Sequence, residues 1–226
     1  MSLLFLLFSL LLPLPSRAGG PTEQVRATVE RVLTIVRNPG LKTSAQKENR
    51  RTQLAQVINP RFDFAEMAKR SLGPHWGRRT SEEQREFVKI FTGLLETLYA
   101  DRIESYAGQN VLYTREVEEA NYAEVFTRIV ADNSRDELSV NYKLHNVDRE
   151  WKVYDLVIED ISLVNNYRFQ FDRVIARSSF EDLVRVMKEK QAQDSEKARP
   201  LHLAGRLERP SVFASFTRIL FKSVQD

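Results

Sequence analysis

The sequence contains no cysteine and only three histidines, His75, His145 and His202. The absence of cysteine excludes thiol catalysis, disulfide bonds and cysteine-based metal sites. None of the histidines stands at a metal-ligand spacing from another histidine or from a carboxylate pair. A glycine-rich phosphate loop and the G-x-S-x-G pattern of serine hydrolases are also missing. The sequence therefore offers no familiar catalytic or metal-binding motif.

Charge of either sign is not in large excess. The chain has 34 basic and 31 acidic residues, for a net charge of +3, and residues 111–160 carry more acidic than basic side chains. A nucleic-acid-binding protein needs a strongly basic face. We therefore expect no nucleic-acid partner.

The one long apolar run, residues 3–14, lies at the start of the chain. It is too short to span a bilayer as a helix. Pro13, Pro15 and the small-x-small pattern Ser16-Arg17-Ala18 follow it, which predicts a signal peptide over residues 1–18 and export of the protein. Because no lysine or arginine precedes the run, retention of the segment as an anchor is the alternative.

The first half of the remaining chain shows helical periodicity. Apolar residues recur every three or four positions in four segments, residues 22–38, 45–58, 62–72 and 80–106. Pro39-Gly40, Asn59-Pro60 and Gly73-Pro74 separate these segments. Thr80 and Glu83 form a capping box at the start of the fourth and most apolar helix.

The second half changes to an alternating pattern, which predicts four strands, residues 111–118, 122–131, 137–146 and 151–159. Short polar turns join them, so neighbouring strands run antiparallel. Two further helices are expected over 163–176 and 180–190. We predict one α+β domain, a curved antiparallel sheet of four strands or slightly more covered by helices. Such a sheet forms a cone whose open end suits a pocket.

The fourth strand is apolar on both faces and contains one carboxylate, Asp155. If Asp155 faces the interior, it could abstract a proton from a substrate. Alternatively, it accepts hydrogen bonds from the backbone, or pairs with an arginine, and holds the corner between strand and helix. The sequence leaves both roles open.

Two long blocks together resemble a known family. They are FDFAEMAKRSLGPHWGRRTSEEQREFVKIFTGLLETLYADRIESY, from Phe62, and WKVYDLVIEDISLVNNYRFQFDRVIARSSFEDLVRVMKEK, from Trp151. They resemble the MlaC-like, or toluene-tolerance, family of periplasmic phospholipid-binding auxiliary components of ABC transporters. The resemblance covers residues 19–192 and leaves a basic C-terminal tail, 193–226, with a short amphipathic helix possible within it.

The resemblance implies an NTF2-like cone whose apolar cavity holds phospholipid acyl chains, with the headgroup near solvent. Family members carry lipid through the periplasm between an outer-membrane lipoprotein complex and an inner-membrane ABC transporter with an MCE-domain ring, which supports outer-membrane lipid asymmetry. The phospholipid would be cargo, and the resemblance implies neither a cofactor, a metal nor a catalytic residue.

Site residues follow from this interpretation. We expect the cavity walls to come from the long helix, the sheet and the corner after it: Phe87, Phe91, Leu94, Leu95, Leu98, Val140, Tyr142, Tyr154, Leu156, Ile158 and Leu163. We expect a movable gate, free of the sheet, to contain Phe62, Phe64 and Met67. The cations expected to contact the headgroup or a docking partner are Lys69, Arg70, Arg78 and Arg79.

Three functions remain compatible with the sequence. The favoured one is a lipid carrier. The second is an exported NTF2-like enzyme that uses Asp155 as a buried acid or base. The third is an interaction module in which all of the apolar surface serves as core.

Overall fold

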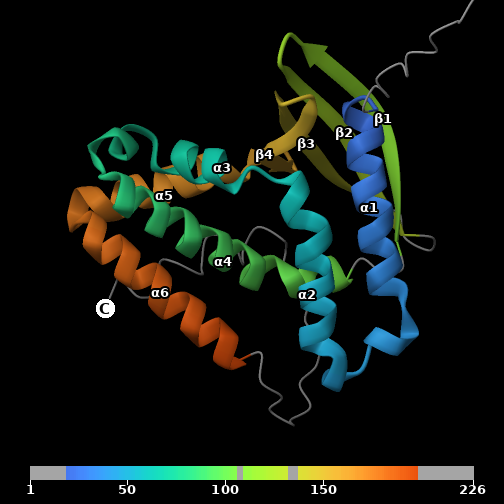
Figure 1. Cartoon of the computed structure of the whole chain (residues 1–226), viewed down its shortest axis with the longest axis horizontal. Coiled ribbons are helices and arrows are strands. Elements are labelled where there is room, and N and C mark those ends of the chain that lie inside the picture. Colours follow the sequence, from blue (N-terminus) through green and yellow to red (C-terminus); the bar gives the residue numbers. More distant parts are fainter. Residues whose placement is uncertain (1–18, 106–108, 132–136, 198–226) are drawn as a thin grey trace, which may run out of the picture.

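The computed structural model describes residues 19–105, 109–131 and 137–197 (Figure 1). The helices are α1 (Pro21–Arg37), α2 (Lys47–Ile58), α3 (Phe64–Leu72), α4 (Ser81–Ser105), α5 (Leu163–Arg177) and α6 (Phe180–Lys197). The strands are β1 (Gln109–Glu119), β2 (Tyr122–Ala131), β3 (Glu137–Val147), β4 (Glu150–Ile158) and β5 (Ile161–Ser162). Short 3-10 turns are η1 (Pro39–Leu41), η2 (Ser44–Gln46), η3 (Asn59–Arg61) and η4 (Gly73–Arg78). The predicted α+β class is confirmed, and α6 continues past the expected domain boundary at residue 192.

The five strands form one antiparallel sheet in the order β1-β2-β3-β4-β5. Two-residue turns with positive φ connect β3 to β4, at Asp148 and Arg149, and β4 to β5, at Glu159 and Asp160. Positive φ at both central residues matches the twist of a tight hairpin. No glycine marks the second turn, so the sequence pattern did not reveal β5.

Helix α1 lies across one face of the sheet, which we call the inner face (Figure 1). Val25 of α1 shares a buried cluster, the sheet core, with Val125, Leu144 and Val153. Both ends of the helix are also tied to β1. The Thr22 backbone N–H donates to Glu116 Oε2 at 2.7 Å, and the Arg37 guanidinium donates to the Gln109 carbonyl at 2.7 Å.

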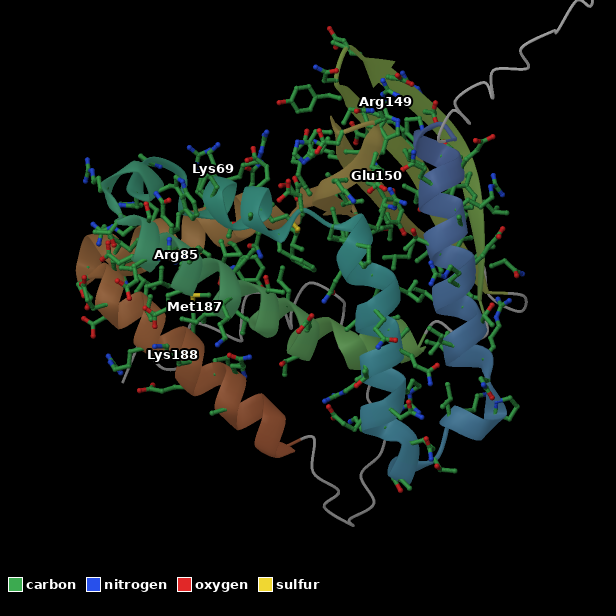
Figure 2. The ribbon with its side chains drawn as sticks, viewed as in Figure 1. Lys69, Arg85, Arg149, Glu150, Met187 and Lys188 are labelled. Atoms are coloured by element: carbon green, nitrogen blue, oxygen red, sulfur yellow. The ribbon has the colours of Figure 1, made fainter. Side chains whose placement is uncertain are left out.

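Helices α3 to α6 form a separate layer with its own core, the helical core (Figure 1). Phe87 and Phe91 of α4 meet the Phe171 ring edge-on, at centroid distances of 5.6 and 5.9 Å. Met187 of α6 is fully buried in this core (Figure 2). Edge-to-face aromatic pairs and close packing stabilise this layer.

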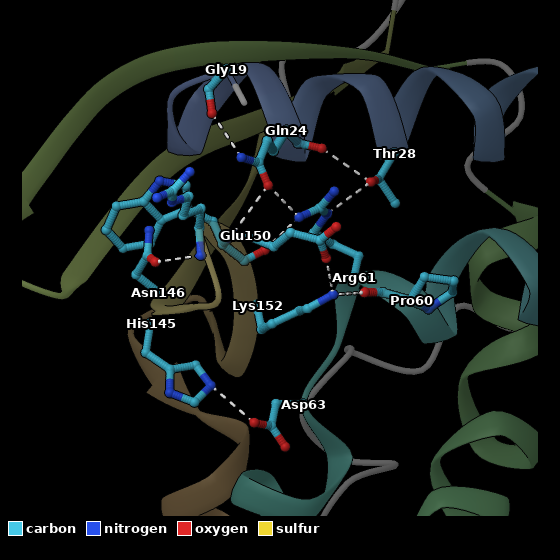
Figure 3. Close-up of polar contacts among 12 residues, drawn as sticks. Gly19, Gln24, Thr28, Pro60, Arg61, Asp63, His145, Asn146, Glu150 and Lys152 are labelled. Carbon is cyan, nitrogen blue, oxygen red and sulfur yellow. Dashed lines mark hydrogen bonds and ion pairs between the residues drawn. The ribbon is translucent and has the colours of Figure 1, made fainter. Parts of the chain in front are cut away.

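The sheet and the helical layer meet along the free edge of β4. Phe62 pairs with Val153 in a parallel bridge, and the Asp63 N–H donates to the Val153 carbonyl at 2.9 Å. Arg61 donates to the Trp151 carbonyl at 2.5 Å and to Gln24 Oε1 at 2.6 Å (Figure 3). The segment before α3 therefore links α1, β4 and the helical layer.

Replacing Arg61 by alanine tests this link. Arg61→Ala leaves the Trp151 carbonyl and the Gln24 amide oxygen without their charged donor, so we expect the free energy of unfolding to fall by about 2 kcal/mol. Chemical denaturation monitored by circular dichroism measures the change. Arg31→Ala, at an exposed position on α1, should change stability by less than about 0.5 kcal/mol. Equal effects of the two substitutions would contradict the link.

Candidate functional site

The inner face carries apolar side chains that the two cores do not use. Cross-strand pairing places Val111, Ile129 and Leu138 in one row, and Val140 and Ile158 in the next. All five lie on the same side of the sheet as Val125. None of them belongs to either core in the part of the chain that the structure describes. We call these five residues the inner-face patch.

The patch is neither solvent surface nor filled core. Val140 is buried, whereas Val111, Ile129, Leu138 and Ile158 are only partly buried. Binding of an apolar ligand to such side chains is favourable, because it removes their remaining apolar surface from water. The patch is therefore the candidate binding surface.

Two tyrosines border the patch on the inner face. Burial raises the pKa of Tyr113 to about 12, despite the nearby Arg26. Burial also raises the pKa of Tyr142 far above its usual value, with a smaller contribution from Tyr113. Tyr142 nevertheless keeps some accessible surface. Desolvation of a phenol on folding disfavours its charged form, so both hydroxyls lie where water is largely excluded.

Four sheet residues expected at the cavity, Val140, Tyr142, Leu156 and Ile158, do share the inner face. The placement expected for Tyr154 is wrong. The register shifts between Lys143 and Leu144, and the resulting β-bulge lets Val153 and Leu156 share a face.

Tyr154 packs in a different aromatic group. Its ring lies 5.9 Å from Tyr122 and 5.6 Å from His145, with the Arg70 guanidinium 4.2 Å above it. Tyr122 and His145 are paired on the face opposite the patch. Alternation alone could not reveal this, because a bulge has no signature in the apolar pattern of β4.

The predicted residues of the long helix are buried against other helices. Leu95 and Leu163 lie in the helical core, and Phe87, Phe91 and Leu94 are each 0% exposed there. The expectation that α4 faces the sheet through these side chains is therefore corrected. An amphipathic stripe predicts which side chains are buried but not which element covers them. The side chain of Leu98 lies outside those that the structure describes.

The expected gate is not free of the sheet. Met67 is 1% exposed in the helical core, and Phe62 stacks on Phe64 with centroids 5.7 Å apart. The bridge from Phe62 to Val153 and the bond from Asp63 hold the start of α3 against β4. The proline and glycine breaks on either side of the segment gave no sign of this attachment.

The four expected headgroup or docking cations fall into two pairs. Arg70 is held by Glu66 at 2.8 Å, and Arg79 lies over the Phe180 ring at 4.7 Å. Lys69 and Arg78 are exposed, and Lys69 extends from the outer surface of α3 (Figure 2). Lys69 Nζ also lies 3.5 Å from Glu66 Oε2, but the side chains of Lys69 and Arg78 are both accessible to a partner.

Asp155 occupies the structural role that the sequence left open. Its carboxylate accepts from Ser162 Oγ at 2.6 Å and from the Val164 N–H at 3.0 Å. Ser162 Oγ in turn accepts from the Asn165 N–H at 3.0 Å, which caps α5. The carboxylate therefore holds the corner between β4 and α5.

Within the described ranges, no group of three or more histidine, aspartate or glutamate side chains is placed to hold a metal. Among the helices of those ranges, none combines the length and the apolar character needed to cross a bilayer.

Comparison with known proteins shows the family and the fold. A model of the MlaC protein family matches residues 26–189, which include the whole sheet. The intermembrane phospholipid transport system binding protein MlaC of Haemophilus influenzae is 22% identical over 147 residues, or 63% of this chain and 69% of that protein. The phospholipid-binding protein of Ralstonia solanacearum, solved with a phospholipid, is 27% identical with a TM-score of 0.70, covering 78% of this chain and 99% of that one.

The two buried phenols predict an unusual alkaline titration. An ordinary tyrosine ionises near pH 10, whereas Tyr113 should ionise near pH 12 and Tyr142 later still. Because Tyr113 holds its proton more tightly in the folded state, the protonated phenol favours folding. This contribution is complete below about pH 10, where an unfolded tyrosine ionises, and is lost as pH rises through about 12, where the folded one does. Ultraviolet absorbance of tyrosinate measures this, and Tyr113→Phe should remove the component near pH 12. Ionisation of every tyrosine near pH 10 in folded protein would contradict it.

Asp155→Ala should lower the free energy of unfolding by about 2–3 kcal/mol, because it leaves the buried Val164 N–H and the Ser162 hydroxyl without an acceptor. Asp155→Asn, which keeps one acceptor oxygen, should cost less. Thermal and denaturant unfolding measure both. A catalytic residue commonly shows the opposite behaviour, and a gain in stability on Asp155→Ala would contradict the structural role.

Proposed function

This chain belongs to the MlaC family, and we propose that it binds a phospholipid through the acyl chains and transports it. The observation that carries the proposal is the inner-face patch of Val111, Ile129, Leu138, Val140 and Ile158. The phospholipid-binding protein of Ralstonia solanacearum shares the fold over 78% of this chain. The proposed ligand is cargo, held without chemical change.

The energetics suit a carrier. Each CH₂ group transferred from water to an apolar surface gains about 0.8 kcal/mol, so one 16-carbon chain gains roughly 10 kcal/mol before ordering costs. We propose that Tyr142, Leu156 and the patch provide this surface. A contribution from Leu98 stays a prediction. Lipid held in this way can cross an aqueous compartment that it could not cross alone.

We also propose the finer role implied by the family, a shuttle in the periplasm between an outer-membrane lipoprotein complex and an inner-membrane MCE-domain ABC transporter. The name of the Haemophilus influenzae relative, which describes intermembrane phospholipid transport, supports it. So does the signal peptide expected over residues 1–18, which lies outside the described residues. Exposed Lys69 and Arg78 are the proposed docking contacts, and their effect should weaken with salt because surface charge is screened within about 8 Å.

Release of the lipid requires part of the wall to move. If the segment of Phe62, Phe64 and Met67 is that part, opening must break the Asp63–Val153 hydrogen bond and lift Met67 out of the helical core. The gate therefore stays a prediction. Opening it would cost more free energy than moving a segment that is not attached to the sheet.

We propose that the protein is not an enzyme. The one carboxylate that suggested acid–base chemistry, Asp155, uses both oxygens as structural acceptors. The matched relatives are described by binding and transport.

A charge within the patch should abolish binding. Leu138→Glu places a carboxylate where acyl chains would remove its water, so we expect bound phospholipid to fall at least tenfold. Mass spectrometry of lipid extracted from protein purified from bacterial cells measures the amount. The matched control is Leu112→Glu, because Leu112 is 49% exposed and lies on the opposite face of β1. The proposal fails if wild-type protein carries no phospholipid, or if both variants retain it equally while circular dichroism shows an intact fold.

A further inference from the structure

The inner face contains a buried polar atom that the fold leaves without a partner. The Tyr113 hydroxyl has almost no accessible surface and no hydrogen-bond partner among the described residues. An unsatisfied buried hydroxyl is unfavourable, and native proteins seldom keep one without a reason. A ligand that displaced the groups covering this hydroxyl and supplied an acceptor would remove this cost.

Tyr142 presents a second hydroxyl to the same region. Tyr113 pairs with Thr127 across β1 and β2, and Tyr142 pairs with Val125 across β2 and β3, so both side chains project from the inner face two positions apart along β2. Both also pack against the sheet core. Tyr113 lies in the same row as Val140 and Ile158, through Thr127. The row of Val111 and Leu138 follows it along the same face. The two phenols therefore stand at the border between the sheet core and the inner-face patch.

The surroundings select the kind of acceptor. The Arg26 guanidinium covers the Tyr113 ring, 4.0 Å from its centroid, so it stacks on the ring face rather than facing the hydroxyl. Both phenols are neutral at physiological pH, so each can donate its O–H to an acceptor oxygen. An anionic phosphate at the buried Tyr113 hydroxyl would lose much of its hydration, and the nearby Glu30 carboxylate would repel it. A neutral carbonyl oxygen has a much lower desolvation cost and accepts one or two hydrogen bonds.

We propose that Tyr113 and Tyr142 form a subsite that donates hydrogen bonds to the ester carbonyls of the bound lipid, where its acyl chains join the glycerol. The inference rests on the proposed lipid-binding function and adds to it a preference for acyl-ester lipids. The patch would then bind the hydrocarbon, while the phenols fix how deeply the chains enter. A lipid without carbonyls would leave the Tyr113 hydroxyl unsatisfied.

A competition between matched lipids tests this subsite. Delipidated full-length protein is mixed with vesicles containing equal amounts of a diacyl phosphatidylethanolamine and its dialkyl ether analogue of the same chain length. Protein is then separated from the vesicles, and the bound lipids are quantified by mass spectrometry. We expect wild-type protein to prefer the ester by about fivefold for each hydrogen bond made. The two lipids differ only in the carbonyls, so headgroup and chain effects cancel.

Variants assign the preference to the two hydroxyls. Tyr113→Phe combined with Tyr142→Phe should bring the ester-to-ether ratio close to one, and the single variants should show how much each contributes. Tyr154→Phe is the matched control, because it removes a hydroxyl from the other face of the sheet, and it should keep the wild-type ratio. In lipid-loaded wild-type protein, the ester carbonyl infrared band should lie at lower frequency than in the double variant.

The outcomes separate this proposal from the carrier function. Equal binding of ester and ether by wild-type protein overturns the subsite and leaves the carrier function standing. Persistence of the wild-type ratio in the double variant also overturns it. Failure of wild-type protein to bind either lipid overturns the proposed function itself, and the subsite with it.

Discussion

The division of the buried apolar side chains between two cores determines the rest of the structure. Helix α4 is the longest helix described, and its buried apolar residues from Phe87 to Leu95 pack against α3, α5 and α6. Over this part of the helix the apolar face is fully used by the helical core and cannot cover a second layer as well. The sheet must therefore obtain its cover elsewhere, and α1 provides it through Val25 and Val29. One helix is too narrow to cover five strands, so part of the inner face keeps apolar side chains outside both cores.

Two residues and one strand edge hold the cores together. Phe62 and Leu156 are the partly buried residues that pack against both clusters. The backbone bond from Asp63 and the side chain of Arg61 fix the same junction through the edge of β4. This attachment also covers a strand edge that would otherwise offer unpaired backbone groups to another chain. The spacing between helical layer and sheet, and with it the shape of the site, depends on this line of contacts.

Local periodicity was enough to predict the elements, and not enough to predict their partners. The bounds of β2 follow directly from the alternation of its residues, and the capping box at Thr80 fixes the start of α4 through reciprocal bonds of 2.7 and 3.2 Å with Glu83. The helical core could be recognised as buried but not assigned to helix–helix packing, because burial looks the same from one sequence whichever layer causes it. Tyr154 was misplaced because a bulge breaks the two-residue period without a glycine to mark it. Tyr142 was expected at the cavity, but Tyr113 was not, since an unsatisfied hydroxyl is a property of the folded arrangement alone.

The same division explains how a fold can reserve space for a ligand without losing its own stability. If the inner-face patch had been filled from α4, the domain would gain apolar burial and have nothing left to bind. If the patch lay in the only core, loading and unloading would disturb the packing that keeps the chain folded. Here the helical core forms without the patch. The loss of apolar burial is therefore confined to one face of the sheet, where four residues stay partly uncovered: Val111, Ile129, Leu138 and Ile158. Proteins commonly depart from optimal packing at functional sites while the rest of the structure compensates. A second, self-sufficient core is the compensation that this sequence provides, and it allows one apolar surface to be covered by cargo.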